Sequence, residues 1–207
     1  GAGAGENGVQ LDGIPLFNPY HASGTLTAID PDVISSVALH AGTMDASLGN
    51  STGSAIELET APPDTARLTT QGAYSARAFR ESVGGPLSAM DGSFLVAVRR
   101  SVNSRLSDVH EQSGLGLQYG DLFARATMPV GGGDLEAFAL HGDDRLGFDA
   151  GIEAPLPAAN DDDHRPSSPL NANALAWTTG TDALRWRSSG ATRWDLRAWR
   201  TRFDASF

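Results

Sequence analysis

The feature that most constrains this fold is a series of segments, each about ten residues long, in which apolar and polar side chains alternate. In the segment 117–128, for example, Leu122 and Ala124 alternate with Asp121 and Arg125. Because successive residues of a β-strand point to opposite faces, this alternation predicts an antiparallel sheet with two unlike faces. The expected strands are 67–74, 76–83, 94–100, 117–128, 135–146, 175–187 and 193–203.

The connections between these strands alternate in length. Segments 84–92, 129–133 and 188–191 are short and rich in turn residues, whereas 101–116 and 147–173 are longer. Short turns on one side and longer loops on the other are typical of a transmembrane β-barrel, and the strand lengths match a tilted membrane crossing. The alternation by itself also fits a soluble antiparallel sandwich, so both architectures remain open at this point.

In the barrel interpretation, the apolar faces contact lipid and the opposite faces line a polar lumen. Glu136 then shares a face with Phe138, which breaks the expected pattern. Phe203 likewise shares the face of Arg197. A β-bulge in each strand would restore the pattern. Four tryptophans would belong to the aromatic girdles at the membrane surfaces: Trp177, Trp186, Trp194 and Trp199.

The charge distribution divides the chain into two units. The net charge is −10, all 15 basic residues are arginine, and the first 66 residues hold eight acidic residues and no arginine. Pro62 and Pro63 cannot continue a central strand, so we place the boundary there, with one domain at 1–63 and a second at 64–207. The acidic balance argues against a nucleic-acid partner. The absence of cysteine excludes disulfides and thiol chemistry.

The first unit contains three strand-like segments, Val9–Leu11, Val33–His40 and Ala55–Thr60. Asp30 followed by Pro31 is typical of a helix start, since an acidic side chain can cap the free amide groups and proline fits the first helical position. We expect only a single turn there. The unit is therefore predicted to be a small mixed domain.

Residues 11–42, followed by 48–60, resemble the C-terminal half of the plug domain of TonB-dependent outer-membrane receptors. Asp12-Gly13 matches the Asp-Gly that follows a plug strand, and Asp30–Leu39 matches a short helix leading into a strand. Gly42, Gly49 and Gly53 match later glycines of the plug. The sequence departs from the family pattern at Thr43, Leu48 and Ser54. Residues 92–101 and 119–126 resemble early barrel strands of such receptors.

This resemblance implies a mainly β fold. It would hold part of a small mixed α+β plug, followed by about seven up-and-down strands of an incomplete transmembrane barrel, since plugged transporters have about 22 strands. We therefore expect a fragment of a receptor for active uptake of a scarce solute, such as a siderophore, cobalamin or oligosaccharide. The resemblance implies location in the Gram-negative outer membrane and energy input from TonB through a segment missing from this chain. It implies no catalytic residues, no cofactor and no metal.

In the resembled family, the plug loop after the Asp-Gly pair points outward and helps to bind the ligand. The corresponding residues are Phe17, Asn18, Tyr20 and His21, whose aromatic, amide and imidazole groups suit stacking and hydrogen bonding to a small solute. The simpler alternative is that Phe17 and Tyr20 only pack the plug against the barrel.

Five arginines on the lumen-facing sides of the strands have a different expected role. We expect them to balance the acidic plug inside the barrel, which would hold the two units together. They are Arg99, Arg125, Arg185, Arg187 and Arg197.

Two further motifs suggest other chemistry. Residues 49–53 match the G-x-S-x-G nucleophile elbow around Ser51, but an elbow requires a helix after it, whereas a strand pattern follows. Residues 161–164, Asp-Asp-Asp-His, could bind a divalent cation but match no known loop spacing. The alternatives to transport are therefore a surface β-protein, as an adhesin or binding sandwich, and a Ser51 hydrolase.

Overall fold

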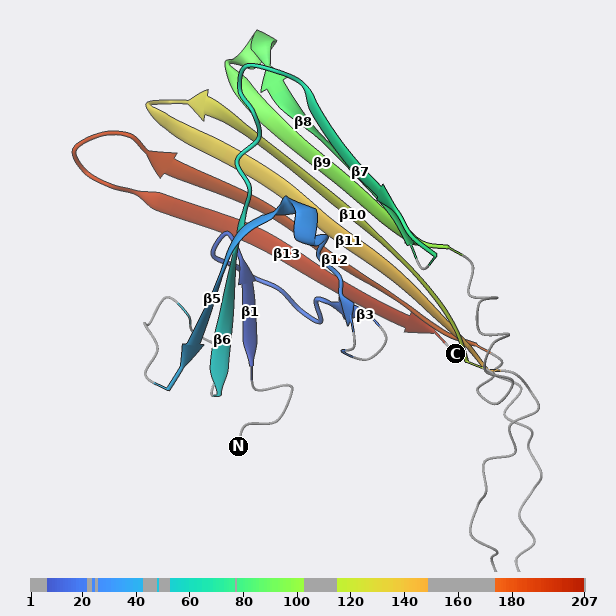
Figure 1. Ribbon diagram of the computed structural model, residues 1–207. Coiled ribbons are helices and arrows are strands. Elements are labelled where there is room, and N and C mark those ends of the chain that lie inside the picture. The colour runs from blue at the N-terminus through green and yellow to red at the C-terminus, as the bar shows by residue number, and fades with distance from the viewer. Residues whose placement is uncertain are drawn as a thin grey trace, which may run out of the picture.

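The computed structural model describes residues 7–21, 24, 26–42, 48, 53–76, 78–102, 115–148 and 174–206. These residues form one large antiparallel sheet and a smaller unit that packs against a single face of it (Figure 1). The possible cation loop at 161–164 and Ser51 lie outside the described residues. No helix among the described residues is long and apolar enough to cross a membrane.

The large sheet has seven strands, as the alternation predicts, and each strand pairs with its neighbours in sequence. This connectivity is an up-and-down meander, the arrangement expected of barrel strands. The strands are β7 (Thr69–Tyr74), β8 (Ala78–Leu87), β9 (Gly92–Ser101), β10 (Leu115–Val130), β11 (Gly133–Phe148), β12 (Ala174–Ser188) and β13 (Asp195–Ser206).

The strand register is continuous in the two strands where a bulge would have restored the alternation. β10 pairs with β11 without a shift from Leu115 opposite Phe148 to Val130 opposite Gly133. β12 pairs with β13 equally regularly. Neither strand therefore has such a bulge, and Phe138 and Phe203 lie on the same face as the arginines. The physical reason is that this face packs against the smaller unit, so it needs apolar as well as charged side chains.

The short connections follow turn chemistry, with one difference from the sequence-based expectation. Gly131 and Gly132, with φ of 62° and 76°, form the two-residue turn between β10 and β11 that requires positive φ at both positions. We expected 84–92 to be a turn, but β8 continues through Gly84 and Gly85 to Leu87, and only Ser88–Met90 form a 3-10 turn. Gly85 is needed in the strand because a Cβ there would lie 3.1 Å from Leu68.

The smaller unit, which we call the plug, contains a four-stranded sheet in the order β2-β1-β6-β5. β1 and β6 are parallel, and β3 and β4 form a separate short hairpin. The Asp30 carboxylate accepts from the Asp32 amide at 3.0 Å and caps the single 3-10 turn Pro31–Val33, as expected. The plug strands are β1 (Gly8–Leu11), β2 (Ile14–Pro15), β3 (Tyr20–His21), β4 (Leu26–Thr27), β5 (Ile34–Ala41) and β6 (Ser54–Thr60).

The hydrophobic core lies between the plug and the sheet rather than inside either one. Plug residues and sheet residues contribute to one continuous buried cluster. Neither unit therefore buries its apolar residues without the other. The cluster consists of Leu11, Ile14, Ile29 and Val33 from the plug and Leu95, Ala97, Phe123, Phe138, Leu140 and Ala183 from the sheet.

The opposite face of the sheet, which we call the outer face, has no second layer among the described residues. Leu184 and Leu196 on this face remain 53% and 57% exposed. Two of the four tryptophans depart from the girdle expectation. Trp177 is buried, and Trp199 has the same strand parity as Arg197, so both belong to the plug-facing side.

Candidate functional site

The contact between plug and sheet is centred on the tight turn that joins β1 to β2. Asp12 and Gly13 occupy this turn with φ of 49° and 78°, so both are in the left-handed region. Leu11 pairs directly with Ile14 across it. This is the Asp-Gly two-residue hairpin turn, and its geometry directs both carbonyl groups away from the plug sheet.

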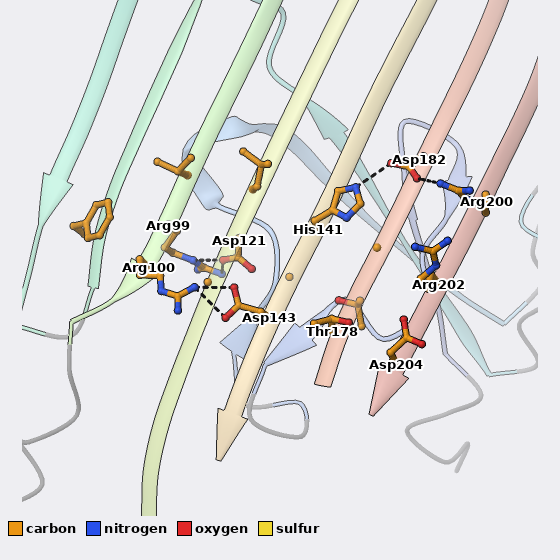
Figure 2. A pocket seen from close by; sticks show the side chains of 17 residues that line it. Arg99, Arg100, Asp121, His141, Asp143, Thr178, Asp182, Arg200, Arg202 and Asp204 are labelled. Atoms are coloured by element: carbon orange, nitrogen blue, oxygen red, sulfur yellow. Dashed lines mark hydrogen bonds and ion pairs between the residues drawn. The ribbon is translucent and has the colours of Figure 1, made fainter. Parts of the chain in front are cut away.

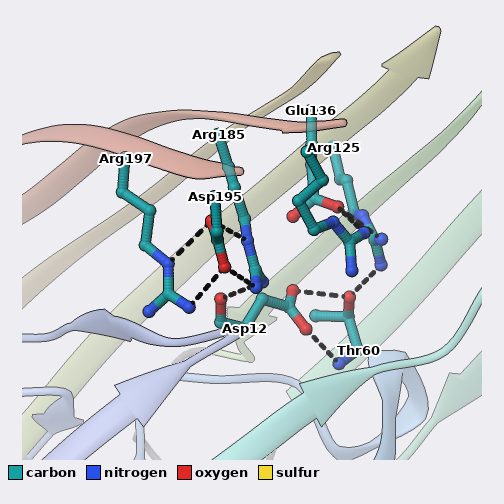
Figure 3. A network of polar contacts seen from close by, with 8 residues as sticks. Asp12, Thr60, Arg125, Glu136, Arg185, Asp195 and Arg197 are labelled. Atoms are coloured by element: carbon teal, nitrogen blue, oxygen red, sulfur yellow. Dashed lines mark hydrogen bonds and ion pairs between the residues drawn. The ribbon is translucent and has the colours of Figure 1, made fainter. Parts of the chain in front are cut away.

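Two arginines of the sheet hold these carbonyl groups, and Figure 3 shows one of them, Arg185, beside Asp12. Arg185 on β12 donates to the Asp12 carbonyl oxygen at 2.8 Å, and Arg197 on β13 donates to the Gly13 carbonyl oxygen at 2.8 Å. The Asp195 carboxylate accepts from both guanidinium groups, at 2.6 and 2.7 Å. Asp195 therefore holds both guanidinium groups against the turn through charge-assisted hydrogen bonds.

The same network continues from the turn to the end of β6. The Asp12 carboxylate accepts from the Thr60 amide at 3.0 Å and from its hydroxyl at 2.7 Å. Arg125 on β10 donates to the same hydroxyl and pairs with Glu136 at 2.8 Å. The buried Glu136 carboxylate lies 3.6 Å from Arg187. We call this network, from Asp195 to Arg187, the turn clamp.

The five arginines singled out from the sequence all lie on the plug-facing side, and each forms an ion pair with a carboxylate of the sheet, at 2.5–3.6 Å. Four of them also contact the plug, through carbonyl or hydroxyl oxygens rather than carboxylates. Plug residues Glu57 and Glu59 line a cavity of about 300 Å³ together with four of the five arginines. A separate ion pair joins Asp32 of the plug to Arg80 of β8 at 2.7 Å.

We predict that Gly13→Ala weakens the docking of the plug by about 2 kcal/mol or more, because an L-residue at positive φ is strained. Its Cβ would also lie 2.5 Å from Arg197, displacing the donor. Thermal melting of the purified intact protein in detergent measures the loss. Gly190→Ala is the matched control, since a Cβ there meets no atom within 4 Å. Equal melting temperatures for the two variants would contradict the role of the turn.

A second contact lies at the β3–β4 hairpin. The His21 side chain is 1% exposed, and its two ring nitrogens lie 2.5 Å from Asp121 and 2.7 Å from Asp144. Arg99 pairs with Asp121 at 2.5 Å and donates to the Thr27 carbonyl oxygen in the same hairpin. The hairpin is therefore held from both of its strands.

The four residues proposed from the sequence to contact a ligand differ in their exposure to solvent. Phe17 is exposed and packs edge-on against Phe203 of β13, with ring centroids 5.6 Å apart. Asn18 adopts a positive φ of 46°, and Tyr20 is half-buried. His21 is enclosed by the sheet and is not accessible to a solute in this conformation.

The outer face carries charged side chains over part of its length. Figure 2 shows Arg100 bound to Asp143, while His141 and Arg200 both reach Asp182. Towards the short turns the same face becomes apolar, with many alanines. The apolar stretch includes Phe94, Val96, Ala124, Ala126, Ala137, Ala139, Leu184 and Ala198.

Three carboxylates of the site were not singled out from the sequence: Asp121, Asp144 and Asp195. Asp121 and Asp195 lie at arginine-bearing positions of alternating strands, so they could have been assigned to the plug-facing side. The contact of Asp121 and Asp144 with His21 could not have been found, because His21 lies 100 and 123 residues away from them. Among the described residues, no group of three or more histidine or acidic side chains could hold a metal ion.

Solved structures that share this fold include those of three receptors. A siderophore receptor, PirA from Acinetobacter baumannii, matches with a TM-score of 0.61 and 15% identity over 98% of this chain and 33% of the receptor. The Pseudomonas aeruginosa outer-membrane ferripyoverdine receptor matches at 0.56 and 20% identity, over 92% and 26%. A ferric enterobactin receptor, PfeA, matches at 0.55 and 11% identity, over 98% and 34%. No protein-family model and no curated protein matches the sequence.

The chain therefore has the fold of a plug and barrel strands of TonB-dependent outer-membrane receptors, as the resemblance in the sequence implies. It spans about a quarter to a third of the length of these receptors. The three matched structures are all those of receptors.

Proposed function

We propose that this chain is part of an outer-membrane receptor that takes up a small, scarce solute. The observation that carries this proposal is the shared core, in which Leu11 and Ile14 of the plug pack with Phe123 and Phe138 of the sheet. An open pore would leave the inner face of its strands polar and wet. A sheet whose inner face completes the core of a small plug fits a transporter that is sealed until the plug moves.

The outer face supports a location in a membrane. Its apolar stretch lies towards the short turns, and its charged side chains lie towards the long connections. A soluble sandwich would bury residues such as Leu184 and Leu196 under a second layer. A membrane accounts for both parts of the outer face without a second layer, because hydrocarbon would surround the apolar stretch and water would surround the charged side chains.

We propose that a ferric siderophore is the first solute to test, because the matched structures are siderophore receptors. The exposed Phe17 and half-buried Tyr20 are the proposed contacts for it, whereas His21 serves to hold the hairpin. TonB would act on a segment of the longer protein. The turn clamp balances the acidic plug, with Glu57 and Glu59 facing the arginines across the cavity.

The intact protein is expected to fractionate with outer membranes, to require detergent for solubility and to change its gel mobility on heating, as folded barrels do. Iron-limited cells that lack it should lose growth on its siderophore and regain it from a plasmid copy. A protein that is soluble without detergent and insensitive to heating would instead indicate a surface sandwich. Loss of growth on no siderophore would reject this solute class but not the membrane location.

A further inference from the structure

His21 occupies a position on the sheet that is formed by two adjacent strands. Asp121 of β10 lies opposite Gly142 of β11, and Asp144 follows two residues later on the same face. The imidazole lies over Gly142, and its Cε1 would be in ordinary van der Waals contact, at 3.5 Å, with a Cβ placed there. The Asp121 and Asp144 side chains are themselves 3% and 2% exposed. The sheet thus presents two buried carboxylates, and the His21 ring lies between them.

The geometry defines the protonation of this ring. Both ring nitrogens lie within hydrogen-bond distance of a carboxylate oxygen, at 2.5 and 2.7 Å. An ionised carboxylate can only accept a hydrogen bond, so both nitrogens must donate, and only the imidazolium has two N–H groups. A neutral ring would direct a lone pair at one of the carboxylates.

A second cation and an aromatic ring lie beside this site. Arg99 pairs with the second oxygen of Asp121, and its guanidinium lies 5.4 Å from the centre of the Tyr119 ring. Tyr119 in turn lies 4.7 Å from the His21 ring, centroid to centroid. Arg99 also acts on the buried Asp30 carboxylate of the plug. The buried carboxylates therefore have cationic partners, which is the condition under which buried charges are tolerated.

We propose that Asp121 and Asp144 form a binding site for a protonated imidazole on the barrel wall, and that withdrawal of the β3–β4 hairpin from this site releases one proton. This inference rests on the plug-and-barrel part of the proposed function but not on the identity of the solute. The two contacts that hold the plug therefore differ in chemistry. The turn clamp uses guanidinium groups that stay charged, whereas the β3–β4 hairpin uses the imidazole of His21, which titrates.

The pH dependence follows from the same contacts. Burial lowers the pKa of His21, but the hydrogen bonds and charges of Asp121 and Asp144 outweigh it and raise the pKa from 6.5 to about 9. A raised pKa stabilises the docked state fully below pH 6.5, and this stabilisation is lost as the pH rises to about 9. Undocking therefore becomes about tenfold easier per pH unit across this window, or roughly 300-fold in total.

Hydrogen exchange of the intact receptor in detergent tests this. Exchange rates of peptides containing β3 and β4 are measured from pH 6.5 to 9.5 and divided by the intrinsic rate at each pH. Protection in the wild type should fall about tenfold per unit up to pH 9 and then level off. In His21→Gln, protection should be low and independent of pH. A flat wild-type profile, or a slope that survives in His21→Gln, would overturn the proposal.

Two further variants keep the result interpretable. His141→Gln removes a histidine that pairs with Asp182 at 2.9 Å on the outer face, and it should leave the hairpin slope unchanged. Asp144→Asn keeps one carboxylate beside His21, so the pKa of His21 should be raised less. The pH range over which protection falls should then end at a lower pH.

Siderophore uptake measured at constant pH is independent of these slopes. A flat slope with intact uptake rejects the proton-coupled hairpin, whereas lost uptake with intact slopes rejects the solute.

Discussion

Phe123→Ala is expected to destabilise the docked plug by about 3–5 kcal/mol, the usual cost of removing a buried aromatic side chain. Phe123 is 1% exposed, and its ring centroid lies 6.3 Å from that of Phe138. It belongs to the cluster that contains Leu11 and Ile14 of the plug, so the cavity would open between the two units. The urea dependence of plug proteolysis in the detergent-solubilised intact protein measures this loss.

Leu122→Ala is the matched control, since Leu122 is the preceding residue on β10 and points to the outer face with 43% exposure. It should leave the resistance of the plug to proteolysis unchanged, because it contacts no plug residue in the core cluster. If both variants lost the same stability, the core would not lie between plug and sheet. A loss of stability confined to Phe123→Ala would support a core that lies between the plug and the sheet.

The second large effect is expected from Arg185→Glu combined with Arg197→Glu. The change removes the charged donors to the Asp12 and Gly13 carbonyl oxygens and places two carboxylates beside Asp195. Each lost hydrogen bond from a charged group costs about 1.5–3 kcal/mol, so the pair costs about 3–6 kcal/mol before repulsion is added. Cells carrying the full-length variant should become sensitive to large antibiotics that a sealed barrel excludes.

Arg67→Glu combined with Arg193→Glu provides the control with the same change of charge. Arg67 has an 85% exposed side chain, and Arg193 lies exposed in the short connection before β13. This variant should keep the wild-type antibiotic resistance. Unchanged resistance in the Arg185 and Arg197 variant as well would show that the turn clamp does not hold the plug.

The turn clamp differs from a simple attraction between an acidic plug and a basic barrel. Each of its arginines is paired with a barrel carboxylate, such as Asp195 or Glu136, and three of them contact the plug through a hydrogen bond to a neutral oxygen. Hydrogen bonds to backbone oxygens depend on position more than on net charge. The clamp therefore recognises the shape of the Asp12-Gly13 turn, which requires positive φ at both positions and so favours Asn, Asp or Gly followed by Gly.

The strands and the faces of the large sheet were predictable from the sequence because the period of a strand is fixed by its backbone. Leu122, Leu184 and Leu196 lie on the outer face, and Arg125 and Arg185 lie on the plug-facing side, as the alternation predicts. The Asp-Pro capped turn and the Gly131-Gly132 turn were also predictable, because these residue types favour the backbone conformations that the turns require. All of these depend on interactions between residues that are close in sequence.

The position of Phe138 and Phe203 was decided only by the tertiary structure. Sequence reasoning assigned polar side chains to the lumen and did not account for these two rings, whereas the plug supplies apolar partners for them. The role of His21 was decided in the same way, since its carboxylate partners lie 100 and 123 residues further along the chain. Local alternation determines which face a side chain occupies, but what covers that face depends on contacts between distant segments, which the alternation does not encode.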